Sequence, residues 1–248
     1  MSVSNLAAPS FLWPGTVAEN CRWIAQRLPE VSEVGVCLFE SEACLAYGEA
    51  DLPAWLPETG LRFHLHLPLD LPWERGFDAG FAVIRKLLEK CARLSPWAAV
   101  LHPPPPDMLA AAARAFEAAG WAPGRVLIEN VKDCDLTEIW PQISRLGFGV
   151  CLDVGHALKY GQDAALALPG LFRHTRMLHL HGAGAQFSHA SMLQLSERGQ
   201  NVTAGVLAQA KEDAVKMIEV FDPEGYRESA VVLEGLLCAP KLDTEAFC

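Results

Sequence analysis

The chain is poor in the features that mark several large classes of proteins, basic residues first among them. Only 20 of its 248 residues are lysine or arginine, against 30 aspartates and glutamates, so the formal net charge is −10. Proteins that bind nucleic-acid backbones usually present a basic surface, because phosphate neutralisation supplies most of their affinity. The acidic balance therefore disfavours a nucleic-acid partner and favours a small-molecule substrate.

Export and membrane signals are also lacking. The start, MSVSNLAAPSFLW, has no basic segment and no apolar stretch long enough for secretion, and no apolar run reaches membrane-spanning length. None of the eight cysteines forms a C-x-x-C pair, and an even cysteine count indicates disulfides only in a secreted chain. We expect a reduced, cytoplasmic protein with no membrane partner, whose oligomeric state the sequence does not indicate.

Glycine-rich nucleotide-binding motifs are missing too, since no G-x-G-x-x-G and no Walker loop occurs. Short apolar runs instead alternate with longer amphipathic segments. The predicted strands are residues 8–13, 33–40, 62–68, 98–103, 125–131, 149–156, 176–182 and 230–235. The predicted helices are 16–28, 77–94, 107–119, 135–146 and 203–220.

This alternation implies parallel strands joined by crossover helices. Eight such units in about 250 residues fit a closed (β/α)8 TIM barrel, and a doubly wound open sheet is the alternative. We predict a single TIM-barrel domain over residues 1–248, with its core at about 8–236 and a peripheral C-terminal tail. Residues 107–119 should begin at Asp107 and end at Gly120, and 135–146 should begin at Asp135 and end at Gly147.

Histidines and acids gather at the ends of the predicted strands. Two strands read FHLHLP (63–68) and LHLHG (178–182), and alternate side chains of a strand share one face, so each pair projects two imidazoles into one space. The C-terminal ends of barrel strands are where active sites are built. The residues placed there or in the adjoining loops are Glu40, His64, His66, His102, Glu129, Asp153, His156, His179, His181, His189 and Glu234.

Imidazoles and carboxylates together bind divalent ions such as Zn²⁺, Fe²⁺, Mn²⁺ or Co²⁺. Any one of these residues has a structural alternative: a buried histidine is usually hydrogen-bonded in the core, and a strand-end glutamate often caps a helix or pairs with arginine. Burying so many imidazoles and carboxylates together in an apolar barrel would cost much free energy without a metal ion to compensate them. We therefore predict one to three divalent ions, which could hold a phosphate and activate water. His64, one layer deeper than His66, is either a ligand or a core residue.

Six short motifs, taken in order, resemble the xylose-isomerase-like TIM barrels over about residues 8–236. They are HLP (66–68), LHP (101–103), IEN (128–130), LDVGH (152–156), HLHG (179–182) and LEG (233–235). The superfamily includes sugar isomerases, epimerases and endonuclease IV. Its sugar isomerases typically hold one ion, and the resemblance gives that role to Glu129, Asp153, His179 and Glu234.

The endonuclease IV-like branch adds histidines that match His66, His102, His156 and His189. This resemblance implies one ion on His66, His102 and Glu129, and a second on Glu129, Asp153, His179 and Glu234. A third would use His156 and His189. The branch has an aspartate in a D-x-H motif here, but residues 187–189 read FSH, so the third ion lacks that ligand unless another residue such as His181 replaces it.

The predicted mouth carries aromatic residues, which suit a bulky, partly hydrophobic small molecule. They are Trp13, Trp73, Phe77, Tyr160 and Phe187. The chain is similar to the cobamide-remodelling phosphodiesterases of this superfamily in its length and in the two motifs HLHLP (64–68) and LHLHG (178–182). That resemblance implies a metal-dependent hydrolase that cleaves the nucleotide loop of a corrinoid, with Glu129, Glu234 and His181 as catalytic residues.

Two other functions stay open. A sugar isomerase or epimerase would use Glu129 and Glu234 as an acid/base pair around one ion. A corrinoid- or metal-binding protein would form no product, although the cobalamin-binding D-x-H-x-x-G motif is absent.

Overall fold

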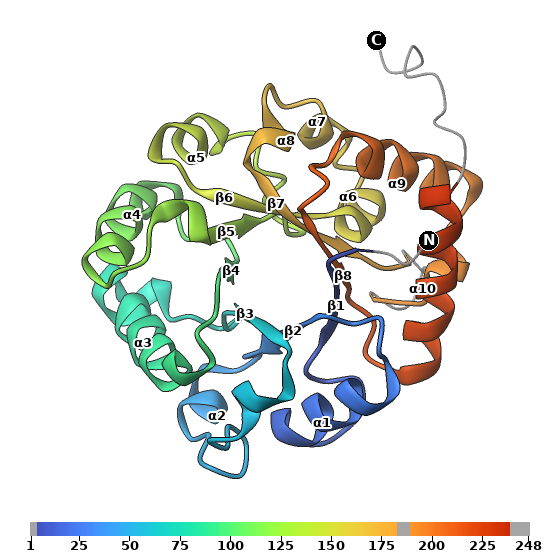
Figure 1. The fold of residues 1–248 in the computed structure, drawn as a ribbon. Coiled ribbons are helices and arrows are strands. Elements are labelled where there is room, and N and C mark those ends of the chain that lie inside the picture. Colours follow the sequence, from blue (N-terminus) through green and yellow to red (C-terminus); the bar gives the residue numbers. More distant parts are fainter. Residues whose placement is uncertain (1–3, 183–188, 239–248) are drawn as a thin grey trace.

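The computed structural model describes residues 4–182 and 189–238, and its strands form a closed barrel (Figure 1). Each strand pairs in parallel with the next along the chain, and the last pairs with the first. The prediction of a (β/α)8 barrel is therefore confirmed. The strands are β1 Leu6–Pro9, β2 Glu33–Cys37, β3 Arg62–His66, β4 Ala99–Leu101, β5 Val126–Glu129, β6 Gly149–Asp153, β7 Thr175–Leu180 and β8 Val215–Ile218.

Helices surround the barrel and cover the outer face of its strands, as Figure 1 shows. The α-helices are α1 Val17–Arg27, α2 Ser41–Leu45, α3 Phe77–Lys90, α4 Leu109–Ala118, α5 Trp140–Leu146, α6 Val154–Tyr160, α7 Asp163–Leu166, α8 Leu171–His174, α9 Glu197–Gln209 and α10 Pro223–Cys238. Short 3-10 helices are η1 Leu56–Thr59, η2 Trp73–Arg75, η3 Ala92–Leu94, η4 Pro106–Met108, η5 Pro123–Arg125 and η6 Met192–Gln194. In the parts of the chain that the structure describes, no helix is long and apolar enough to cross a membrane.

Local sequence signals set many helix ends. Thr16 and Glu19 form a capping box at the start of α1, which satisfies two backbone N–H groups that have no partner within the helix. Gly147 ends α5 in the left-handed conformation, as predicted. The predicted starts were less accurate. Asp107 lies in η4 and makes no capping bond to α4, and α5 starts at Trp140 rather than near Asp135.

The apolar core has two parts. The larger one lies between the strands and the helices, and the smaller one fills the inside of the barrel. The inner part consists of Ala7, Ala98, Val100, Leu127, Cys151, Met177, Val215 and Met217. Because strand side chains alternate between faces, the same strands can hold this inner core and, two residues further on, present polar groups at the mouth.

A buried polar network lies near the N-terminal ends of the strands. The Nδ1 atom of His64 is 2.7 Å from Glu33 Oε1, and the indole N–H of Trp97 donates to that same oxygen at 2.7 Å. The His64 ring fits because residue 35 is glycine, where a Cβ atom would lie 2.5 Å from His64 Nε2. The sequence left open whether His64 is a metal ligand or a core residue. Its contacts are those of a core residue paired with Glu33.

The prediction for strand eight was wrong. Residues 230–235 lie in α10, and the segment 203–220, predicted as one helix, contains the end of α9 and then β8. The β-branched run AVVLE looked like a strand, whereas in the fold it belongs to the helix that covers the final strand. A last strand at 230–235 would have left the barrel without its closing helix, which the (β/α)8 pattern requires.

Candidate metal centre

Six consecutive strands deliver polar side chains to the C-terminal mouth of the barrel. His66 and Glu129 end β3 and β5, Asp153 ends β6, and His179 lies in β7. The other residues follow directly after strands or lie in the first turn of a helix. They are His102 after β4, His156 in α6, His181 after β7, His189 beyond it, and Glu219 after β8.

Glu129 is the centre of this arrangement. Its Oε2 atom is 3.2 Å from His66 Nε2 and 3.1 Å from His102 Nε2. Its other oxygen, Oε1, is 2.8 Å from His179 Nδ1. Glu129 is 1% exposed, so these contacts lie inside the protein. Its two oxygens face different imidazoles, which is the geometry expected of a bridging carboxylate.

Two further carboxylates surround His179. Its Nδ1 atom lies 3.1 Å from Glu219 Oε2 and 3.9 Å from Asp153 Oδ2. Single ligand atoms of Glu129, Asp153, His179 and Glu219 all lie within 4.8 Å of one another, and so do those of His66, Glu129 and His179. The two groups share Glu129 and His179, so they form one continuous centre.

Three histidines form a neighbouring group, in which ligand atoms of His156, His181 and His189 lie within 4.8 Å of one another. Asp153 joins this group to the main centre, because its Oδ1 atom is 3.2 Å from His181 Nε2 and its Oδ2 atom is 3.2 Å from His156 Nδ1. Residue 155 has to be glycine, since a Cβ atom there would lie 2.1 Å from the His181 ring.

His189 has an unusual backbone. Its φ is 60°, in the left-handed region that few residues other than glycine adopt. This conformation brings its N–H to 3.3 Å from His181 Nδ1, and its own Nδ1 to 3.4 Å from Glu219 Oε2. Strained backbone of this kind concentrates at functional sites.

The hydrogen bonds show which ring nitrogens are available to a cation. His66 Nδ1 is 3.1 Å from the Leu67 carbonyl, which can only accept, so Nδ1 carries the hydrogen and Nε2 has a free lone pair. That lone pair faces Glu129 Oε2, another acceptor. His181 differs, because its Nδ1 lies 3.0 Å from the Gly182 carbonyl and also accepts from the His189 N–H at 3.3 Å, so these contacts do not fix its tautomer; its Nε2 faces Asp153 at 3.2 Å.

Buried acceptors that face one another repel unless a proton or a cation lies between them. Several buried side-chain atoms here have no hydrogen-bond partner among the described residues, namely Glu129 Oε2, Asp153 Oδ2, His179 Nε2, His181 Nε2, His189 Nδ1 and Glu219 Oε2. The residues therefore fit divalent cations, and the donor set of imidazole nitrogen and carboxylate oxygen suits zinc, iron or manganese.

The charges of the metal-free centre agree with this interpretation. Burial opposes the charged forms, but His179 and the imidazoles of His102 and His66 hold the pKa of Glu129 well below its ordinary value. Burial also opposes a charged His179, yet the neighbouring Cys151, Glu219 and Glu129 raise its pKa well above the ordinary value. The protein thus compensates its clustered carboxylates with imidazolium where a cation would otherwise do so.

Glu234 does not belong to this centre. It lies exposed on α10, outside the barrel, so its predicted position at the end of strand eight was wrong. Glu219 occupies that position instead and is 3% exposed. Sequence reasoning missed it because 203–220 was taken as one helix. The polar triplet KED (211–213), followed by the mostly apolar segment AVKMI (214–218), was the available signal for a turn and a strand.

The predicted aromatic residues have mixed positions. Tyr160 lies 5.6 Å from His156, between ring centroids, and Trp13 is 39% exposed and packs on Trp23. Trp73 and Phe77 stack on each other and pack against the larger apolar core. Phe187 lies outside the described residues.

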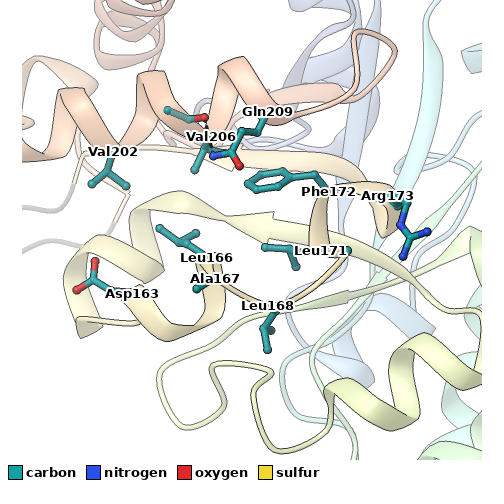
Figure 2. A pocket seen from close by; sticks show the side chains of 12 residues that line it. Asp163, Leu166, Ala167, Leu168, Leu171, Phe172, Arg173, Val202, Val206 and Gln209 are labelled. Atoms are coloured by element: carbon teal, nitrogen blue, oxygen red, sulfur yellow. Dashed lines mark hydrogen bonds between the residues drawn. The ribbon is translucent and has the colours of Figure 1, made fainter. Parts of the chain in front are cut away.

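A cleft in the outer layer of the molecule is separate from this site. Its volume is about 490 Å³, and it lies on the outer layer between α7, α8 and α9. Figure 2 shows Leu166, Leu171, Phe172 and Val206 converging across it. None of its lining residues belongs to the polar groups at the barrel mouth, so it is not part of this site.

Several solved structures share the fold. The 3-keto-D-glucoside 4-epimerase YcjR from E. coli has a TM-score of 0.65 at 12% identity, over 95% of this chain and 99% of that chain. D-psicose 3-epimerase from Clostridium cellulolyticum H10 has a TM-score of 0.63 at 11% identity, over 94% and 98%. SacUVDE has a TM-score of 0.61 at 14% identity, over 96% and 99%.

No protein-family model matches the sequence, and no curated protein matches it significantly. At 11–14% identity the structural likeness shows the fold alone. The chain is thus a TIM barrel with buried histidine and carboxylate clusters that are consistent with a divalent metal site.

Proposed function

We propose that the chain is a metal-dependent hydrolase of the xylose-isomerase-like superfamily, in its endonuclease IV-like branch. Its reaction would be cleavage of a phosphodiester in a small molecule, namely the nucleotide loop of a corrinoid. The observation that supports this most is the pair of extra imidazoles on Glu129. His66 and His102 lie 3.2 and 3.1 Å from Glu129 Oε2, whereas His179 approaches the other oxygen, Oε1, at 2.8 Å.

A second observation is the histidine group beside the main centre. The resemblance predicted a third ion on His156 and His189 but left its aspartate ligand missing. His181 lies in that group, within 4.8 Å by ligand atoms, and supplies the third donor. We assign one ion to His66, His102 and Glu129, a second to Glu129, Asp153, His179 and Glu219, and a third to His156, His181 and His189.

Each part of the site has a role in this proposal. When bound, divalent cations would neutralise a phosphate and lower the pKa of water. Glu129 holds the two halves of the centre at a fixed spacing, and Asp153 connects the second half to the histidine group. His102 and His189, with side chains 28% and 21% exposed, face the open side, from which the phosphodiester enters. The buried residues below them keep bulk water out.

The runner-up is a sugar isomerase or epimerase, because Glu129, Asp153, His179 and Glu219 also form a one-ion set. Glu129 and Glu219 would then act as the acid/base pair. That reading leaves His66 and His102 without a function, although each approaches a buried carboxylate oxygen of Glu129. A corrinoid- or metal-binding protein without activity is the third possibility.

The test is anaerobic incubation of the purified protein with adenosylcobalamin, with and without Zn²⁺, Fe²⁺ or Mn²⁺. Mass spectrometry and the visible spectrum report the products. We expect a cobinamide-type product that has lost the lower ligand. Activity should fall by about a hundredfold or more in His66→Ala and His102→Ala, because even residues that only support a ligand are worth 10–100-fold.

His174→Ala is the matched control, since His174 packs on Trp140 away from the mouth and should leave turnover unchanged. An intact corrinoid with every metal would refute the corrinoid assignment. Sugar turnover that survives His66→Ala and His102→Ala would establish the isomerase alternative.

A further inference from the structure

Three phenylalanines extend from the metal centre along the mouth of the barrel. Phe11 follows β1, Phe39 follows β2, and Phe221 follows β8. These strands are neighbours in the closed barrel. Strands β3 to β8 supply the histidines and carboxylates, so the polar part of the mouth and the aromatic part meet at β8. We name Phe11, Phe39 and Phe221 the aromatic wall.

The wall is continuous and begins at the metal centre. The Phe221 ring lies 5.1 Å from the His189 ring, between centroids. Phe39 packs edge-on against Phe221 at 5.6 Å, and Phe11 packs edge-on against Phe39 at 5.7 Å. Edge-to-face contacts of this kind fix ring orientation, so the wall is a preformed surface rather than three separate side chains.

The backbone beside each ring is held as well. The Leu12 N–H donates to the buried side chain of Asn20 at 2.8 Å, and the Leu38 N–H donates to the His66 carbonyl at 2.9 Å. The Glu219 N–H donates to the Leu180 carbonyl at 3.0 Å. Phe11 is 38% exposed, and Phe39 and Phe221 are half-buried, so the three contacting rings present a continuous apolar surface at the mouth.

A polar hollow adjoins the wall at Phe221, which is one of its lining residues. Its volume is about 480 Å³, and its lining includes His189, Ser191, Gln194, Asp222, Glu224 and Glu228. Carboxylate oxygens accept hydrogen bonds and repel anions. The hollow therefore favours neutral or cationic N–H donors, while the negative phosphodiester belongs with the metal centre.

We infer that the aromatic wall and the adjoining hollow together form the subsite for a large planar ring system that carries amide groups on its edge. The ring system would pack against Phe11, Phe39 and Phe221, whose neighbouring planes are inclined at 89° and 78°, and its edge N–H groups would reach Glu224 and Glu228. A surface three rings long exceeds what one nucleobase or one sugar covers. This inference rests on the proposed function, and it assigns to the wall the corrin ring rather than the nucleotide part of the substrate.

Binding of dicyanocobinamide tests the subsite without any turnover, because this ligand has the amide-bearing corrin ring but no phosphodiester. Equilibrium dialysis against metal-loaded protein, read by visible absorbance, would compare the wild type with Phe39→Ala and Phe221→Ala. We expect each substitution to raise the Kd by about tenfold, as loss of one aromatic contact commonly does. Phe39→Leu should give a smaller rise, because it keeps apolar bulk.

Phe172→Ala is the matched control, since Phe172 is a half-buried phenylalanine on the outer layer and should bind like the wild type. Metal content is measured in every variant. A variant that keeps its metal is still folded, so its weaker binding can be attributed to the missing phenylalanine ring. The inference is overturned if wild-type protein does not bind dicyanocobinamide, or if the wall variants with normal metal content bind it as well as Phe172→Ala. Binding that depends on the wall, together with no cleavage of adenosylcobalamin, would refute the proposed reaction and leave the subsite standing.

Discussion

Most residues of the polar centre could be predicted one by one, because the ends of the strands are readable in this sequence. His66, Glu129, Asp153 and His179 each follow a short apolar run, and all four lie in the centre. Glu219 could not be found in the same way, since its strand was merged with the preceding helix. Which glutamate follows β8 depends on where the barrel closes, and that is a property of the whole chain.

Substitution of Glu219 should therefore reduce metal content and activity, whereas substitution of Glu234 should leave both unchanged. We expect Glu219→Ala to lose one metal equivalent and to reduce activity by about a hundredfold or more, because a direct ligand is worth at least as much as its supporting residues. Elemental analysis and turnover of the same preparations check this. Glu234→Ala, on the exposed side of α10, should keep both, and equal behaviour of the two variants would contradict the assignment.

At the scale of the element, short strands carry two different polar layers. In β3, His64 and His66 point into the barrel at different depths, and only the upper one meets the metal centre. Periodicity predicted that both share a face. It could not decide their roles, because those depend on Glu33 and Glu129, which come from β2 and β5.

Removal of Glu33 should destabilise the fold without emptying the site. Glu33→Ala leaves the buried His64 Nδ1 and Trp97 Nε1 without their acceptor, so we expect a loss of about 3 kcal/mol in the free energy of unfolding. Urea denaturation of metal-free protein measures it. Glu58→Ala, on the exposed surface, should change stability by less than about 0.5 kcal/mol. If folded Glu33→Ala lost its bound metal, the Glu33–His64 pair would not be independent of the metal centre around Glu129, which would contradict this prediction.

At the scale of the whole molecule, folding forces buried carboxylates and imidazoles together, so stability should be linked to metal. A cation at a hundred times its Kd stabilises the folded state by about 2.7 kcal/mol per site. We expect the Tm to rise with added Zn²⁺, Fe²⁺ or Mn²⁺ and to fall with a chelator. Calorimetry measures both, and Glu129→Ala should show a much smaller response. A chelator-independent Tm in protein that contains metal would contradict this linkage.

The sequence by itself determined the fold class, the polarity of the strand ends and the chemistry of the donors. These follow from local hydrophobic patterns and residue types, which need no knowledge of distant contacts. Only the tertiary structure decided that Glu219 closes the centre in place of Glu234, that His64 pairs with Glu33, and that His181 joins His156 and His189. It also decided that Phe11, Phe39 and Phe221 lie side by side. The reason is physical: closing the barrel brings β8 against β1, so residues more than two hundred positions apart become neighbours, and no local pattern in the chain encodes that contact.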